Sequence, residues 1–299
     1  MVDVGGDFVV SGQERDSVAK VRIYGGVMTD TFSRETGCGS VNVGGTMSVG
    51  TGCRVLPISE AYTGGSLVFT VGKLQVETGG SIDATGCGFR QVTSETPSSI
   101  APGTGTDFKY GGGYGGRGGF DSSLKPEDRD PRFLGQVYGS AYAPVDAGSC
   151  SGEYFGNNGV GGGLIRVHAG RIDLAGKLLA DGTSGYGSGS GGGIWLTARS
   201  YKFRPGAVLS ACGANNYGGG GGGRIAIWRK ADADLIARLA AGEQPTSDYL
   251  QPRDIETFNV AFPGVTVKVL GGQQGKTSVG EPGTFGWFPV QQGLLLQVK

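Results

Sequence analysis

Short runs of alternating apolar and polar residues, separated by glycines, fill most of the chain. Three of them follow glycine triplets at residues 161, 191 and 221, in the segments GGGLIRVHA, GGGIWLTAR and GGGRIAIWR. The triplets are therefore 30 residues apart, and a more distant copy, GGSLVFTVG, begins at residue 64. Short β-forming runs that are broken by glycine corners at such a period are typical of stacked strands.

The residues after each triplet continue the repeat. The segments KLQVETGGSIDATG (73–86), RIDLAGKLLADG (171–182) and YKFRPGAVLSACG (201–213) each give a short strand, a glycine-containing corner, a second short strand and a turn of small residues. This pattern predicts an all-β fold, a parallel β-helix or solenoid of about seven to nine coils. We expect residues 1–299 to form this single domain.

Two segments depart from the pattern. Residues 91–160 break the period but hold many tyrosines, phenylalanines and glycines, so we expect a long insertion that folds against one flank of the solenoid. Residues 230–244 have helical periodicity, with Leu235 and Leu239 on one face, and predict one short helix.

The 30-residue register predicts which side chains face the core, because successive residues of a strand point to opposite sides. It places Ile165, Trp195 and Ile225 in one inward column, and it places Arg166 and Trp228 outside. The helix or the insertion would bury Trp228 if either of them covers it, and the sequence leaves this open.

Composition excludes several classes of protein. Of the 299 residues 62 are glycine, yet 37% are apolar and 9% aromatic, which is too much for a disordered linker. The chain has no Gly-X-Y period, so its glycine content does not indicate collagen. Lys plus Arg equal Asp plus Glu at 26 each, so we expect no nucleic-acid partner. No apolar run is long enough for a membrane span, so we expect no membrane partner either.

The N-terminal sequence MVDVGGDFVV has neither the basic region nor the apolar region of a signal peptide. Its methionine is followed directly by strand-like sequence. We therefore expect a monomeric domain of a larger multidomain enzyme that is secreted to the extracellular space.

The five cysteines are not spaced as metal ligands, and the chain has only one histidine. We expect the cysteines to be small turn residues that stack on one another or pair, and we expect no metal site and no cofactor. Nothing in the sequence indicates structural calcium, whose occupancy stays open. The cysteines are Cys38, Cys53, Cys87, Cys150 and Cys212.

The glycine runs suggest two binding functions that the surrounding sequence does not support. A phosphate-binding loop needs its glycines before a helix, but the run in NNYGGGGGGRIAIWRK (215–230) leads into a strand. The segment GGGYGGRGG (111–119) has one arginine in a chain of zero net charge, which is weak support for RNA or DNA binding.

A polysaccharide lyase or glycoside hydrolase is the strongest catalytic alternative. A hydrolase needs two carboxylates facing one groove, but Asp83, Asp173 and Asp181 fall in different columns of the repeat. The acidic segment PEDRDPR (126–132) has the composition of a salt-bridged loop. His168 is the single histidine, and we expect a solvated strand residue rather than a catalyst there.

Carbohydrate binding needs fewer specific residues than catalysis does, because sugar rings stack on aromatic faces beside polar groups. Tyr186 and Tyr217 occupy matching turns, TSGYGSG and ANNYGGG, and we expect them side by side on one edge. The alternative is that the aromatic rings pack over glycine corners. The candidate binding residues are Tyr110, Tyr114, Tyr138, Tyr142, Tyr154, Tyr186, Tyr217, Trp228 and Arg166.

The segment YGSAYAPVDAGSC (138–150), followed by GVGGGLIRVHAG, GSGGGIWLTA and GGGGGGRIAIW, resembles glycine-rich β-helix domains of large bacterial surface and secreted proteins. More narrowly, residues 64–230 resemble carbohydrate-binding module family 89, whose members are attached to gut-bacterial xylanases. The resemblance implies a right-handed parallel β-helix that binds xylan or xylo-oligosaccharides without catalysis. It supplies no binding residues position by position.

The function that we expect is therefore recognition of a plant cell-wall polysaccharide, most simply xylan, by aromatic stacking on the solenoid flank. A β-helix polysaccharide lyase or glycoside hydrolase is the first alternative. A structural or adhesive surface stalk is the second.

Overall fold

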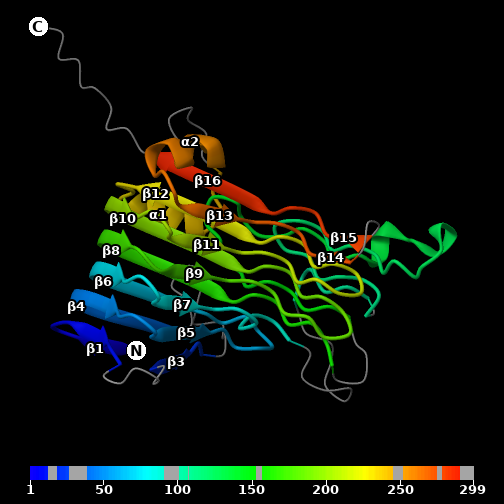
Figure 1. The fold of residues 1–299 in the computed structure, drawn as a ribbon, viewed down its shortest axis with the longest axis horizontal. Coiled ribbons are helices and arrows are strands. Elements are labelled where there is room, and N and C mark those ends of the chain that lie inside the picture. The colour runs from blue at the N-terminus through cyan, green and yellow to red at the C-terminus, as the bar shows by residue number, and fades with distance from the viewer. Residues whose placement is uncertain are drawn as a thin grey trace, which may run out of the picture.

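Parallel β-strands form two sheets that lie face to face (Figure 1). The computed structural model describes residues 1–12, 19–26, 39–90, 101–106, 108–152, 157–244, 252–274 and 278–289. Sheet A has the order β1-β4-β6-β8-β10-β12-β16, with β2 also paired to β4. Its strands are β1 (Val2–Val4), β2 (Phe8–Val10), β4 (Gly39–Val49), β6 (Leu67–Val76), β8 (Leu164–Leu174), β10 (Gly193–Phe203), β12 (Arg224–Arg229) and β16 (Thr284–Pro289).

Sheet B has the order β13-β11-β9-β7-β5-β3, so from β3 to β13 the chain mostly alternates between the two sheets. A separate antiparallel pair, β14 (Gln273–Gln274) and β15 (Ser278–Val279), lies in the C-terminal part. The strands of sheet B are β3 (Lys20–Tyr24), β5 (Arg54–Ile58), β7 (Ser81–Asp83), β9 (Lys177–Leu179), β11 (Val208–Ser210) and β13 (Thr266–Lys268).

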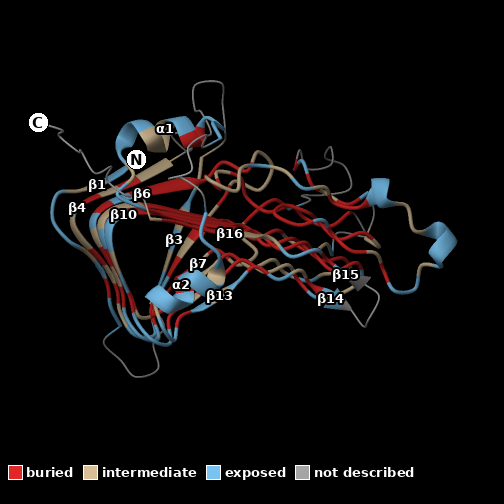
Figure 2. Ribbon diagram, turned by 90° about the horizontal axis from the view of Figure 1, so that it is seen from above, coloured by how far each residue is buried: buried red, intermediate tan, exposed pale blue. Residues whose placement is uncertain are grey.

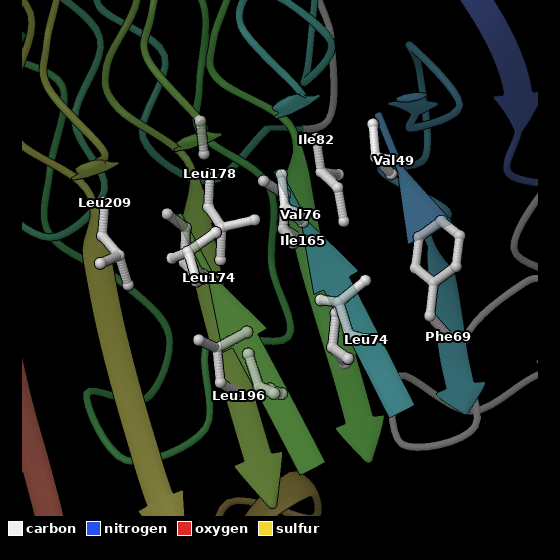
Figure 3. Close-up of a cluster of buried hydrophobic side chains, with 14 of the residues drawn as sticks. Val49, Phe69, Leu74, Val76, Ile82, Ile165, Leu174, Leu178, Leu196 and Leu209 are labelled. Atoms are coloured by element: carbon white, nitrogen blue, oxygen red, sulfur yellow. The ribbon is translucent and has the colours of Figure 1, made fainter. Parts of the chain in front are cut away.

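The main apolar core lies between the two sheets (Figure 3). Leu74, Leu174 and Leu196 come from sheet A, and Leu178 and Leu209 come from sheet B. All five side chains are fully buried. This apolar layer supplies the hydrophobic stabilisation that holds the sheets together.

The strand register corrects the expected core column. Ile194, not Trp195, pairs with Ile165 on one side and Ile225 on the other. The spacing between paired positions is thus 29 and then 31 residues, because Gly193, the last residue of the second triplet, already pairs with Leu164 and Arg224. Trp195 consequently lies on the outer face of sheet A, opposite Arg166.

Beyond the strands, the chain continues as extended glycine-rich segments that pack backbone against backbone. Gly112 donates to the Ser188 carbonyl at 2.9 Å and Gly116 to the Gly222 carbonyl at 2.9 Å. A Cβ atom on either glycine would overlap a neighbouring carbonyl oxygen. Figure 2 shows buried residues continuing from the sheets into this extension. We call these segments the glycine layer: residues 111–119, 161–163, 189–193, 218–223, 271–272 and 280–283.

The predicted insertion supplies part of this layer and covers the outer face of sheet A. In its described part the regular elements are two short 3-10 helices, η1 (Pro126–Asp128) and η2 (Pro131–Phe133). The Asp130 carboxylate accepts from the Arg132 guanidinium at 2.6 Å, in agreement with the expected salt-bridged loop.

The described part of the chain holds two α-helices where one was predicted. Helix α1 (Ala233–Ala240) lies within the predicted range and begins at Asp232, whose carboxylate accepts from the Leu235 N–H. Helix α2 (Ile255–Ala261) was not predicted and buries Phe258 beside β16. Among the described residues, no helix is long and apolar enough to span a membrane.

The structure overturns the predicted fold class. A right-handed parallel β-helix of seven to nine coils is not shown; the strands form two layered parallel sheets that are not closed on each other. Layered parallel sheets point to an α/β-type fold, the class in which parallel sheets are most common. The prediction failed because a strand, a glycine corner and a second strand give the same sequence pattern in either arrangement.

The glycine layer yields a stability prediction. In a Gly223→Ala variant the new methyl group would overlap the Gly192 carbonyl oxygen, so the packed segments must separate. We expect the free energy of unfolding to fall by about 1–3 kcal/mol in urea denaturation, the usual cost of overpacking. Gly5→Ala is the matched control because no atom lies within 4 Å of its added Cβ. Equal effects of the two substitutions would contradict the close-packing explanation.

Candidate functional site

Trp228, one of the predicted sugar-stacking residues, is a packing residue in the structure. Its ring stacks on Phe288 with centroids 4.0 Å apart and planes 5° from parallel. Its indole N–H donates to the Tyr142 carbonyl at 2.7 Å. Leu239 of α1 belongs to the same apolar cluster. The insertion and α1 therefore bury Trp228 completely, which settles the point that the sequence left open.

Three further predicted tyrosines also pack inside the molecule. Tyr114 is fully buried, tilted against Tyr138 with centroids 4.8 Å apart, and under the Arg224 guanidinium. Arg224 donates to the Tyr138 carbonyl at 2.7 Å, and the Tyr138 hydroxyl contacts the Ser149 hydroxyl at 2.9 Å. Burial raises the pKa of both phenols well above the usual range. Tyr110 is buried between Phe120 and Phe133.

Arg166 is likewise inside, on the covered outer face of sheet A. Its guanidinium lies 5.4 Å from the centre of the Trp195 ring, in a cation–π contact. His168 meets the same ring edge-on at 5.2 Å, and its Nδ1 lies 2.7 Å from the Thr197 hydroxyl. The expected solvated His168 is therefore half-buried in a structural cluster.

Tyr186 and Tyr217 remain exposed, with 43% and 37% of their surface accessible. A parallel β-bridge joins Gly187 to Tyr217, so the two tyrosine turns are neighbours as the repeat predicted. The bridge is offset by one residue from the sequence match, so Tyr217 stands beside Gly187 and not directly beside Tyr186. Tyr142 is partly buried against the Trp228 cluster, with its ring centroid 5.6 Å from that of Phe288. Tyr154 lies outside the described residues.

Polar side chains hold these two turns in place. The Ser184 hydroxyl donates to the Asn215 carbonyl at 2.7 Å, and the Asn216 amide donates to the Gly185 carbonyl at 2.6 Å. The Asn215 side-chain oxygen accepts from the Gln273 N–H at 2.7 Å. We call Ser184, Tyr186, Asn215, Asn216 and Tyr217 the tyrosine edge. It combines two accessible rings with amide and hydroxyl groups, which is the chemistry that sugar binding requires.

A second polar surface was not singled out in the sequence. A groove of about 530 Å³ lies on the outer face of sheet A, where β6 and β8 end. The alternation of residues 171–174 and 202–204 signals these outward polar positions. The register, which brings Gln75, Asp173 and Lys202 onto adjacent strands, was needed to assemble them. We call this the charged groove; its polar lining includes Thr51, Lys73, Gln75, Glu77, Asp173 and Arg204.

Asp173 is the electrostatic centre of the charged groove. It is 8% exposed and accepts from Arg204 Nε at 2.9 Å and from Arg204 Nη2 at 3.1 Å. Arg171 lies 4.0 Å away. The Arg204 hydrogen bonds, aided by the charges of Lys202 and Lys73, hold the pKa of Asp173 below its usual range. Asp173 is therefore ionised and fully paired at neutral pH, which is unsuitable for a general acid.

Neither metal ligation nor cysteine pairing is seen in the described ranges. No group of three or more His, Cys, Asp or Glu side chains there is placed to hold a metal ion. Cys53, Cys87 and Cys212 are free thiols, the buried Cys150 thiol lies 3.6 Å from the Thr104 hydroxyl, and Cys38 lies outside the described residues. Burial, with a contribution from Asp83, raises the pKa of Cys87 to about 11, so its thiol is protonated and unreactive at neutral pH.

No protein-family model matches this chain, and comparisons with curated proteins and with solved structures find no match either. The function must therefore be argued from the site itself.

His168 gives a pH prediction with an unambiguous readout. Burial, and then the charge of Arg166, lower its pKa from 6.5 to about 4. Between these values the unfolded chain binds a proton that the folded protein does not, so the free energy of unfolding falls as pH falls from about 6.5 to 4. The full loss is up to about 3 kcal/mol.

NMR titration of the imidazole measures this directly, because the chain has a single histidine. We expect a midpoint near pH 4, and urea unfolding of His168→Gln should lose the corresponding part of the pH dependence. A midpoint near 6.5 would show that His168 is solvated, as the sequence suggested.

Proposed function

We propose that this protein is a non-catalytic carbohydrate-binding module that holds a neutral plant cell-wall polysaccharide on the tyrosine edge. One observation carries the proposal: Tyr186 and Tyr217 are exposed on neighbouring backbone segments, beside the amides of Asn215 and Asn216. Exposed tyrosine faces stack on the C–H faces of pyranose rings, while amide groups hydrogen-bond to sugar hydroxyls.

Xylan is the first ligand to test. The support for it is the resemblance of the glycine motifs to those of carbohydrate-binding module family 89. The β-helix that this resemblance implies is not the fold observed, so the motifs support the ligand only through their sequence.

The titratable groups favour binding over hydrolysis. A glycoside hydrolase needs a carboxylic acid that stays protonated near neutral pH beside a second carboxylate. Among the described carboxyl groups with a shifted pKa, every shift is downward; these are Glu60, Asp130, Asp173 and Asp254. Their hydrogen bonds stabilise the ionised form, which makes them poor proton donors.

The binding test is affinity gel electrophoresis on xylan and on a soluble glucan. We expect xylan to retard the unmodified protein, and the double variant Tyr186→Ala/Tyr217→Ala to bind about tenfold or more weakly, because each ring contributes about 1 kcal/mol. The variant Tyr186→Phe/Tyr217→Phe keeps both rings and should retain binding. Tyr24→Ala, which removes a tyrosine 66% exposed on β3, is the matched control.

Three outcomes would contradict the proposal. Unchanged retardation of the Tyr186→Ala/Tyr217→Ala variant would place the site elsewhere. Release of reducing ends or of unsaturated sugars from the polysaccharide would show an enzyme. A protein that shows neither retardation nor product would instead fit the structural or adhesive stalk.

A further inference from the structure

The charged groove is separate from the tyrosine edge and has a different chemistry. It is formed where β6 and β8 end, with Lys73 paired to Arg171 and Gln75 paired to Asp173 across the two strands. The tyrosine edge lies instead on the turns that follow β9 and β11. A ligand of the charged groove therefore need not be the ligand of the tyrosine edge.

The groove and its rim carry an excess of positive charge. The lining itself is balanced, with Lys73 and Arg204 against Asp173 and Glu77. The excess comes from two cations beside Asp173 at the rim: Arg171, whose Nη2 lies 4.0 Å from that carboxylate, and Lys202, whose charge helps to lower its pKa. Arg204 is committed to Asp173 through two hydrogen bonds. Arg171 and Lys202 are both exposed. Arg171 lies on β8, as Asp173 does, and Lys202 lies near the end of β10, two residues before Arg204. The excess of two positive charges suits an anionic ligand.

The neutral lining points to an anion that also carries hydroxyl groups. Gln75, Thr51 and Thr78 line the groove with amide and hydroxyl groups. The Gln75 oxygen accepts from Lys73 at 2.6 Å, which directs the amide N–H groups of Gln75 to a ligand, and the Thr51 hydroxyl donates to the Thr78 carbonyl at 3.0 Å, which leaves its oxygen as an acceptor. Glu77 is exposed and accepts hydrogen bonds only. A sugar hydroxyl can donate to Glu77, whereas a phosphodiester backbone would be repelled by it. These groups together favour a sugar acid over a nucleic acid.

The strand spacing suits a chain of such sugars. Adjacent strands of a sheet are about 4.8 Å apart, close to the length that one pyranose ring adds to an extended polysaccharide. Lys73 on β6 and Arg171 on β8 are in register and therefore match successive rings of a chain that crosses the strands, while Lys202 on β10 stands beside Asp173, two residues further along.

From these observations we propose that the charged groove binds an acidic polysaccharide through the carboxylates of its uronic acid residues. Arg171 and Lys202 pair with sugar carboxylates, Lys73 and Gln75 hydrogen-bond to neighbouring hydroxyls, and the Arg204–Asp173 pair holds the floor of the groove in shape. This site adds to the proposed recognition of a neutral polysaccharide and does not depend on it.

The test is isothermal titration calorimetry with oligogalacturonate at low ionic strength. We expect Arg171→Gln/Lys202→Gln to weaken binding at least tenfold, and added salt to weaken binding of the unmodified protein. Both side chains are exposed, so the variant should remain folded. The matched control is Lys177→Gln/Lys268→Gln, which removes the same charge from exposed positions on β9 and β13 of sheet B.

The outcomes separate this inference from the proposed function. Xylan retardation should be unchanged in Arg171→Gln/Lys202→Gln, and oligogalacturonate binding should be unchanged in Tyr186→Ala/Tyr217→Ala. Three results would overturn the inference: no oligogalacturonate binding by the unmodified protein, equal loss in the sheet B control, or tighter binding of a single-stranded oligonucleotide of equal charge.

Discussion

The close approach of glycine backbones is the constraint on which the rest of the structure depends. Glycines of the insertion, such as Gly116, lie against glycines such as Gly222 from the loops of sheet A, with N–H groups donating across the contact. A Cβ atom on Gly115 would overlap the Gly223 carbonyl oxygen, and one on Gly221 would overlap the Gly116 carbonyl oxygen. Gly116 and Gly222 do not have positive φ, so they are needed for space and not for an unusual backbone conformation. Their hydrogen bonds satisfy backbone groups that would otherwise be buried without partners.

This packing decides which side chains are available for binding. By docking against the sheet A loops, the insertion covers Arg166, Trp195 and Trp228 on the outer face of that sheet. The chain thereby removes from solvent most of the aromatic side chains that suggested sugar binding. Tyr186 and Tyr217 stay accessible because they stand at the turns, where this cover ends. The strands β6 and β8 pass beyond the cover at their C-terminal ends, which leaves the charged groove open.

The two open surfaces differ in the interaction that each supplies. The tyrosine edge offers apolar ring faces and uncharged hydrogen-bonding groups, on which the proposed recognition of a neutral sugar depends. The charged groove offers long-range attraction that salt screens, and its buried Asp173 keeps Arg204 in one orientation. A plant cell wall presents both kinds of polysaccharide, so the two surfaces are compatible with one overall role in binding it.

The sequence by itself determined the strands and their approximate period, because alternation and glycine corners are local properties of the chain. It also predicted that the turns of Tyr186 and Tyr217 are neighbours, since the repeat aligns them. Only the tertiary structure decided that Ile194 and not Trp195 enters the core, because one residue of register reverses every face of a strand. It also decided that the two sheets are layered and not closed into a solenoid, and that the insertion buries Trp228 and Arg166. Both outcomes depend on contacts between segments far apart in the chain, which no local pattern of residues records.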